Sequence, residues 1–160
     1  MNDENKQRIR EFTDLQAWQA AFKLALNIQE VTKSFPREEV YGITSQIRRS
    51  ALSATANIAE GFGKQTYKEK VHYYYQAHGS LVETKNHLLL AKGYKYIQEK
   101  EFCQLTENMG HAHRLLLGLI RSSKAYLYSH SRIKNLESRI QNLLPTPPSP
   151  TSPNSSDGPH

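Results

Sequence analysis

The chain has 160 residues with 38% hydrophobic residues, and its mean hydropathy is −0.68. Its 21 basic and 15 acidic residues give a net charge of +6, and its single cysteine excludes an intramolecular disulfide. No apolar run is long enough to span a membrane, and the polar N-terminus contains no signal peptide, so we expect a soluble, cytoplasmic protein without a membrane partner.

The first of four stretches with helical periodicity covers about residues 14–34. Thr13 and Gln16 have the spacing of a capping box, in which each side chain satisfies a free amide of the first turn. Pro36 is expected to stop this helix. Its apolar residues form a broad stripe: Leu15, Trp18, Ala21, Phe22, Leu24, Ala25, Ile28 and Val31.

The second stretch covers about residues 41–62 and is rich in alanine, which would let a neighbouring helix approach closely. Gly61 and Gly63 are expected to end it, because glycine adopts the left-handed closing conformation at little cost. Its apolar positions recur every three or four residues: Ile43, Ile47, Ala51, Ala54, Ile58 and Phe62.

The third stretch begins at Thr66, which with Glu69 again fits a capping box, and ends at Gly93. Its expected core stripe includes Val71, Tyr74, Tyr75, His78, Leu81, Val82, Leu88 and Leu89. The fourth stretch begins near Gln98 and reaches at least Ser123. It can continue to about Leu144, because the period is kept by Ile133, Leu136, Ile140 and Leu143.

Short links between the four helices predict an all-α protein, an antiparallel up-down-up-down four-helix bundle over residues 13–144. Residues 1–12 form a polar N-terminal arm in this interpretation. Residues 145–160 contain six of the seven prolines and too little apolar mass for a core, so we expect a disordered tail.

The signals of an enzyme are mostly negative. The chain lacks a phosphate-binding GxxxxGK[ST] loop and a GxSxG elbow, and residues 61–64 (GFGK) lie between two helices rather than after a strand. Cys103 has no activating base near it in the sequence, so a lone small thiol is the simpler interpretation. We therefore expect no catalytic residue, no cofactor and no enzymatic activity.

Two Glu-x-x-x-His pairs leave a metal site open as a minor alternative. Glu83 with His87, and Glu107 with His111, each share one face of a helix, on two consecutive helices. A metal-dependent bundle enzyme could use all four residues. Two ordinary surface pairs explain the same spacing, so the sequence favours no bound metal.

Basic charge is concentrated toward the end of the chain, where residues 111–160 contain six basic and two acidic residues. Arg114, Arg121 and Lys124 share a stripe of the fourth helix, and cations that gather in this way can neutralise phosphates. The remaining members of the predicted nucleic-acid-binding surface are Arg132, Lys134 and Arg139, followed in rank by Lys64, Lys68 and Lys70. A solvated charged face is the structural alternative.

Two arginines, Arg48 and Arg49, lie among the apolar residues of the second helix, so at least one of them is expected to point inward. A buried arginine needs a carboxylate partner, for which Glu60 and Glu83 are the candidates, with Asn57 one turn before Glu60. We interpret these five residues as a structural polar network, with an anion site at the two arginines as the functional alternative.

Residues 41–63, YGITSQIRRSALSATANIAEGFG, resemble the signature of the 23S rRNA intervening-sequence protein family of bacterial four-helix bundles. Further matches follow in family order: DL at 14–15, WQ at 18–19, KSFP at 33–36, GSLVE at 79–83, KGY at 92–94 and GLIRSSK at 118–124. One departure is Ala54-Thr55, where the family usually has Ile-Pro.

This resemblance implies an antiparallel bundle that assembles into a ring, typically a homopentamer, and it does not imply a catalytic activity. Similar bundles are the accessory variability proteins of diversity-generating retroelements, which bind a reverse transcriptase and its template RNA. The leading hypothesis is therefore a non-enzymatic, homo-oligomeric RNA-binding accessory or scaffold protein, with a reverse transcriptase as a further candidate partner. The alternative is a protein-protein interaction adaptor that does not bind nucleic acid.

Overall fold

The computed structural model describes residues 9–143, which form four α-helices, three short 3-10 helices and no strand. The elements in chain order are η1 (Phe12–Asp14), α1 (Gln16–Val31), η2 (Thr32–Ser34), η3 (Arg37–Val40), α2 (Ile43–Gly63), α3 (Tyr67–Gly93) and α4 (Glu99–Leu143). The predicted all-α class is confirmed. The expected disordered tail and most of the expected N-terminal arm lie outside the described residues.

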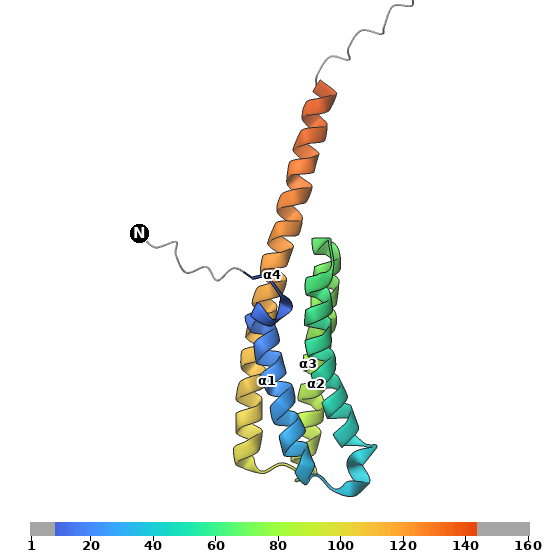
Figure 1. Cartoon of the computed structure of the whole chain (residues 1–160), viewed down its shortest axis with the longest axis vertical. Helices are drawn as coiled ribbons and strands as arrows, with labels where there is room; N and C mark the ends of the chain where they lie inside the picture. Colours follow the sequence, from blue (N-terminus) through green and yellow to red (C-terminus); the bar gives the residue numbers. More distant parts are fainter. Residues whose placement is uncertain (1–8, 144–160) are drawn as a thin grey trace, which may run out of the picture. The chain divides into compact units, whose positions relative to one another are not determined.

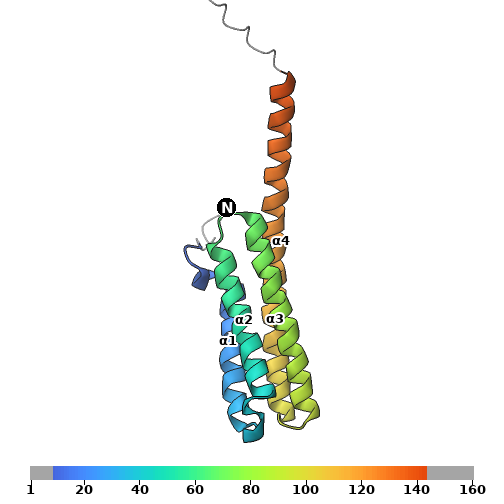
Figure 2. The same cartoon turned by 90° about the vertical axis from the view of Figure 1, so that its right-hand side faces the viewer.

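The chain divides into two units, one ending at Leu127 and the other beginning at Tyr128, so α4 contributes to both. Within the first unit, α1, α2, α3 and the first part of α4 lie side by side as a helical bundle (Figures 1 and 2). Between residues 9 and 143, no helix is both long and apolar enough to cross a membrane.

The starts of the helices follow local hydrogen bonding, and only one of two predicted capping boxes forms. At α3 the backbone N–H of Glu69 donates to Thr66 Oγ1 at 3.2 Å, and the N–H of Thr66 donates to Glu69 Oε2 at 3.3 Å. The box predicted from Thr13 and Gln16 is wrong, because Leu15 precedes the first residue of α1 and provides no side-chain cap.

The core of the first unit consists of aliphatic side chains and alanines from all four helices. The buried apolar residues of the helices include Leu24, Ile28, Ile47, Ala54, Ile58, Tyr74, Ala77, Leu81, Leu88, Leu105, Met109, Ala112 and Leu116. Four residues that the sequence assigned to the apolar stripes of α1 and α3 are exposed instead: Phe22, Tyr75, Val82 and Leu89. On α3 the line containing Tyr74 and Leu81 faces inward, and residues one position further on face outward.

Helices α2 and α3 pack closely, with more close backbone contacts between them than between α1 and α2. Small polar residues line their contact. The fully buried Thr84 hydroxyl donates to the Ser80 carbonyl at 2.7 Å and lies 2.9 Å from Ser50 Oγ. One turn further along, Ser53 Oγ and Ser80 Oγ are 2.9 Å apart. We call these four hydroxyl residues (Ser50, Ser53, Ser80 and Thr84) the hydroxyl seam.

Gly61 has a packing role in α2 that differs from its predicted one. None of the glycines in the described part of the chain has a positive φ, so the expected left-handed ending by Gly61 and Gly63 is wrong. A Cβ at position 61 would lie 2.6 Å from Cε1 of Tyr74, whose side chain is only 2% exposed. Glycine at this position therefore makes room for a buried aromatic ring of α3.

We predict that Gly61→Ala destabilises the protein by about 1–3 kcal/mol, because the buried Tyr74 ring has to move. The matched control is Gly79→Ala in the middle of α3, where an added Cβ would meet nothing within 4 Å. That change should stabilise the protein by about 0.5–1 kcal/mol through helix propensity. Urea unfolding measures both values, and shifts in the same direction would contradict the packing role of Gly61.

Candidate nucleic-acid interface

The first unit places two of the predicted arginines on one exposed face of α4. Arg114 and Arg121 are seven residues apart, close to two helical turns, and both side chains are exposed. Among residues 9–143, no carboxylate lies within ion-pair distance of either guanidinium group. Both arginines are therefore able to contact a polyanion without first breaking an ion pair in the described part of the chain.

Lys124, the third predicted cation of this stripe, interacts with an aromatic side chain of α3. Its Nζ donates to Tyr75 Oη at 3.5 Å and lies 5.8 Å from the centroid of the Tyr75 ring. The tyrosine ring is exposed, so the pair presents a cation and an aromatic face together at the surface. This combination suits an unpaired base beside a phosphate.

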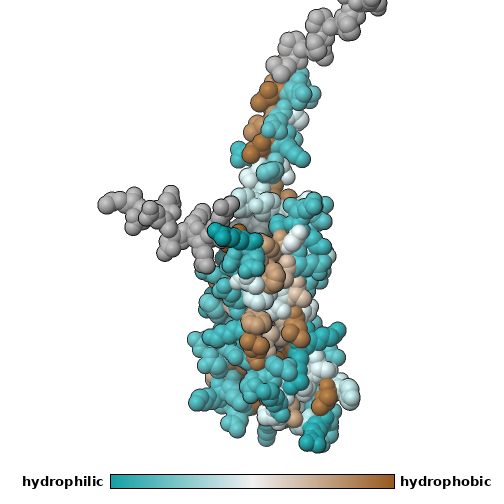
Figure 3. Space-filling view, viewed as in Figure 1, coloured by the Kyte–Doolittle hydropathy of each residue, from teal (hydrophilic) through white to brown (hydrophobic). Residues whose placement is uncertain are grey.

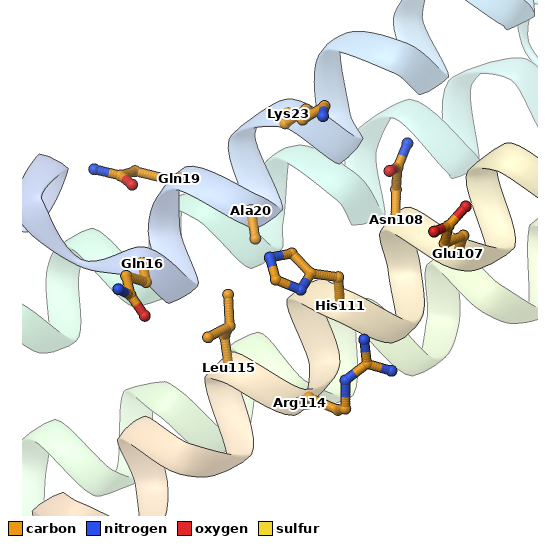
Figure 4. Close-up of a pocket in the computed structure, with 9 residues that line it drawn as sticks. All are labelled: Gln16, Gln19, Ala20, Lys23, Glu107, Asn108, His111, Arg114 and Leu115. Atoms are coloured by element: carbon orange, nitrogen blue, oxygen red, sulfur yellow. The ribbon is translucent and has the colours of Figure 1, made fainter.

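A cleft of about 550 Å³ opens between α1 and α4 beside Arg114. Its lining residues are Gln16, Gln19, Ala20, Lys23, Glu107, Asn108, His111, Arg114 and Leu115. Figure 4 shows the His111 ring pointing from α4 toward Ala20 of α1. The Asn108 amide nitrogen is buried and has no hydrogen-bond partner among residues 9–143. Two cations, several amide groups and one carboxylate therefore line this cleft.

Lys23 was missed by the sequence analysis. It is a single lysine on α1, far in sequence from the basic segment, and no spacing rule connects it with Arg114. The two residues line the same cleft only because α1 and α4 are neighbours in the bundle (Figure 4).

The second unit contains the other three cations of the first-ranked set. Arg132, Lys134 and Arg139 are exposed within a helical stretch whose only described acidic residue is Glu137. No ion pair involving these cations is formed among the described residues. This stretch therefore keeps a positive net charge.

Two of the three lysines of the second-ranked set, Lys64 and Lys70, interact with other residues of the bundle. Lys64 Nζ lies 3.1 Å from Glu60 Oε1 and 4.5 Å from the ring centroid of Tyr73, and the hydrogen bonds to Glu60 and Tyr73 raise the pKa of Lys64. Lys70 donates to the backbone carbonyl of Phe62 at the end of α2. Lys68 is exposed, so it is the member best placed for an external anion.

The five residues of the predicted polar network make separate contacts. Arg48 Nε donates to Thr32 Oγ1 at 2.7 Å, whereas Arg49 Nη2 lies 3.6 Å from Glu83 Oε1 of α3. Asn57 Nδ2 donates to the carbonyl of Ser53 in its own helix at 2.9 Å.

Glu60 does not meet either arginine of that set. Hydrogen bonds from Tyr73 and then Lys64 lower the pKa of the Glu60 carboxyl group. Of the two carboxylates proposed as arginine partners, Glu83 therefore contacts an arginine and Glu60 contacts a lysine.

The two Glu-His pairs do not converge on a common centre. His87 Nε2 lies 3.5 Å from Glu83 Oε1 on α3, while Glu107 and His111 line the cleft toward α1. Within residues 9–143, no group of three or more His, Cys, Asp or Glu side chains is arranged to hold a metal ion.

A histidine pair that the sequence analysis did not single out connects α3 with α4. The Nε2 atoms of His78 and His113 are 2.8 Å apart, so one ring donates its proton to the other. Burial lowers the pKa of His113, and the positive charges of His78 and Lys85 act in the same direction. Thirty-five residues separate the two histidines, and no local motif connects them.

A second cleft, of about 340 Å³, lies between α3 and α4 and is mostly apolar. Val82, Leu89, Phe102 and Met109 are among its lining residues. The exposed apolar residues of α3, Tyr75, Val82 and Leu89, recur every seven residues and form one stripe beside it. An outward apolar stripe beside a groove is typical of a surface that meets another protein.

Comparison with solved structures shows the same helical fold in a protein from Bacteroides thetaiotaomicron VPI-5482. That protein is described as one of unknown function from the S23 ribosomal protein family. The alignment has a TM-score of 0.61 and 23% sequence identity, and it covers 66% of this chain and 95% of the other. No curated protein matches the sequence.

The family model described as "23S rRNA-intervening sequence protein" matches residues 13–118, which is more than half of the chain. The chain therefore belongs to the 23S rRNA-intervening sequence protein family, and the resemblance found in its sequence is confirmed. The match includes Lys23 and Arg114 and ends before Arg121 and the second unit.

We predict that the protein becomes less stable as the pH falls below about 6.5, the ordinary pKa of histidine. Because folding lowers the pKa of His113, the unfolded chain binds its proton more readily, and acid favours unfolding. His113→Gln should reduce this pH dependence. Urea midpoints at about pH 7.5 and about pH 5.5 measure it.

The control for this experiment is His111→Gln, which changes an exposed histidine on the same helix. Equal loss of pH dependence in the two variants would contradict the role of the half-buried His78–His113 pair.

Proposed function

We propose that this protein is a non-enzymatic, homo-oligomeric accessory protein that binds structured RNA through the cations of α4. The observation that carries the proposal is the exposure of Arg114 and Arg121 on one face, with no carboxylate partner in the described chain. Free guanidinium groups bind phosphates bidentately and displace condensed counterions. The Lys124–Tyr75 pair adds a place where an unpaired base can stack.

The α1–α4 cleft favours RNA as the ligand over a polyanion that lacks bases and ribose. The exposed Gln16 amide can donate to and accept from base edges and ribose hydroxyl groups, while Lys23 and Arg114 hold the phosphates at the same cleft. Binding is the whole role in this proposal, and no residue acts as a catalyst or holds a cofactor.

Self-association completes the proposal. The subunit is an antiparallel up-down-up-down bundle, and copies meet through two different surfaces, as a closed ring requires. One surface is the part of the α3 apolar stripe formed by Val82 and Leu89 beside its groove, which leaves Tyr75 to the RNA. The other is α1, where Trp18 stacks on the exposed Phe22 at a centroid distance of 4.9 Å and hydrophobic side chains reach the surface (Figure 3).

The two surfaces lie on helices that α2 separates, since α2 contacts both α1 and α3. A head-to-tail contact between them leaves the α4 cations of every copy available. A ring of five such copies would multiply weak phosphate contacts through avidity. The same assembly could carry a reverse transcriptase as a further partner, as the resemblance to retroelement accessory proteins implies.

We predict that Arg114→Gln combined with Arg121→Gln weakens binding to a labelled RNA stem-loop by about tenfold or more at low salt. The slope of log affinity against log salt should become shallower by about 1–2, because fewer counterions are released. Fluorescence anisotropy at several salt concentrations measures both quantities.

The matched control is Arg37→Gln combined with Lys100→Gln, which removes the same charge from exposed positions outside α4's basic stripe. Equal losses of RNA affinity in both double variants would show that binding depends on the overall charge and not on this interface. Absence of RNA binding by the unmodified protein at low salt would contradict the proposal and favour the protein-interaction adaptor.

We predict that Val82→Glu lowers the molar mass in solution toward the 18.3 kDa of one chain, because a carboxylate would enter the apolar stripe. Light scattering after size exclusion measures the mass. Gln76→Glu, an exposed polar position on the same helix, should leave it unchanged. A monomeric unmodified protein would contradict the self-association part of the proposal while leaving the RNA experiment valid.

A further inference from the structure

The second unit contains an apolar line that no side chain of the described chain covers. Ile133, Leu136, Ile140 and Leu143 are 53%, 50%, 58% and 83% exposed. From residue 129 to residue 143 they are the only apolar side chains, and all other positions are polar or charged. Figure 3 shows hydrophobic side chains gathered along one side of this stretch and hydrophilic ones on the other. We call the four residues the terminal seam.

The spacing within the terminal seam is three, four and three residues, which assigns them to positions a, d, a and d of a heptad. The two a positions are isoleucine and the two d positions are leucine. β-Branched residues at a with leucine at d favour two parallel strands. We infer that residues 129–143 pair in parallel with the same segment of a second copy of this chain, as a short two-stranded coiled coil.

The charged neighbours of the seam specify the orientation of the pair. In this register Arg132 and Arg139 occupy g positions and Glu137 occupies an e position. In a parallel coiled coil, a g residue meets the e residue five positions later on the other helix. Arg132 of each copy would then meet Glu137 of the other, giving two ion pairs related by symmetry.

An antiparallel pair would have the opposite electrostatics. There g positions face g positions and e positions face e positions, so with the seams overlapped Arg139 would lie against Arg139 of the other copy and Glu137 against Glu137, and like charges would repel. The arrangement of three charged residues therefore selects parallel pairing and disfavours antiparallel pairing.

The length of the seam indicates when pairing occurs. Two heptads are marginal on their own, because isolated helices shorter than about 12–15 residues are barely stable in water. Copies already assembled through their bundles would hold these segments at a high effective concentration, and in a ring of five the segments would pair two by two and leave one unpaired. Pairing does not depend on RNA binding, and the family match at residues 13–118 does not include the seam.

A cysteine experiment on the full-length protein tests the inference. Leu143→Cys in a Cys103→Ser background removes the exposed native thiol and places one thiol at a d position. In a parallel pair the two thiols are adjacent and form a disulfide under mild oxidation, whereas in an antiparallel pair they are about 15 Å or more apart. Ser138→Cys in the same background faces away from the seam and should not cross-link.

Variants of the terminal seam in the Leu143→Cys background distinguish specific pairing of the helices from random collision of the thiols. Ile133→Glu combined with Ile140→Glu should lower the cross-linked fraction about tenfold, a loss of about 1.4 kcal/mol. Asn135→Glu combined with Ser138→Glu adds the same charge outside the seam and should not lower it. Arg132→Glu should weaken cross-linking, and adding Glu137→Arg to the same chain should restore it.

Absence of a Leu143→Cys cross-link in the purified protein overturns the inference, including the case in which another protein covers the seam. Equal cross-linking of the seam variants and their controls also overturns it. RNA affinity measured on the same samples is a separate readout, so failure of RNA binding and failure of pairing are distinguishable.

Discussion

The close approach of α2 and α3 is the contact on which the rest of the bundle depends. Small side chains let the two backbones come together, and the hydroxyl seam gives hydrogen-bond partners to polar groups of which Ser50, Ser80 and Thr84 are buried. Ser50, Ser80 and Thr84 also donate to carbonyls of their own helices, so the contacts between hydroxyl groups of facing helices add a preference for one register. A purely apolar contact of alanines would permit more sliding.

Both clefts lie beside α4. This helix reaches the core through large side chains such as Leu105, Met109 and Leu116. Longer side chains hold helices further apart, so α4 is flanked by a polar cleft toward α1 and an apolar cleft toward α3. The helix that contains the free arginines is therefore also the helix beside which a ligand or another subunit has room.

Most of the secondary structure could be predicted from the sequence, because each helix repeats its apolar residues with helical period and is bounded by glycine, proline or a cap. The predictions that failed depended on contacts with neighbouring helices, which the sequence does not reveal. The role of Gly61 comes from a tyrosine on another helix, and the exposure of Tyr75 comes from which of two adjacent lines α2 covers. Lys64 and Lys70 were predicted to be surface cations, yet Lys64 forms an ion pair with Glu60 and Lys70 donates to a carbonyl at the end of α2. Lys23 and Arg114 share a cleft only through the packing of α1 against α4.

The contact between Gly61 and the Tyr74 ring has a consequence for comparing family members. The two positions share one small volume, so a side chain at the first can be accommodated only by a smaller residue or a displaced helix at the second. Among homologues they should covary as a matched pair in total size. A large residue at both positions would mark a member whose second and third helices lie further apart.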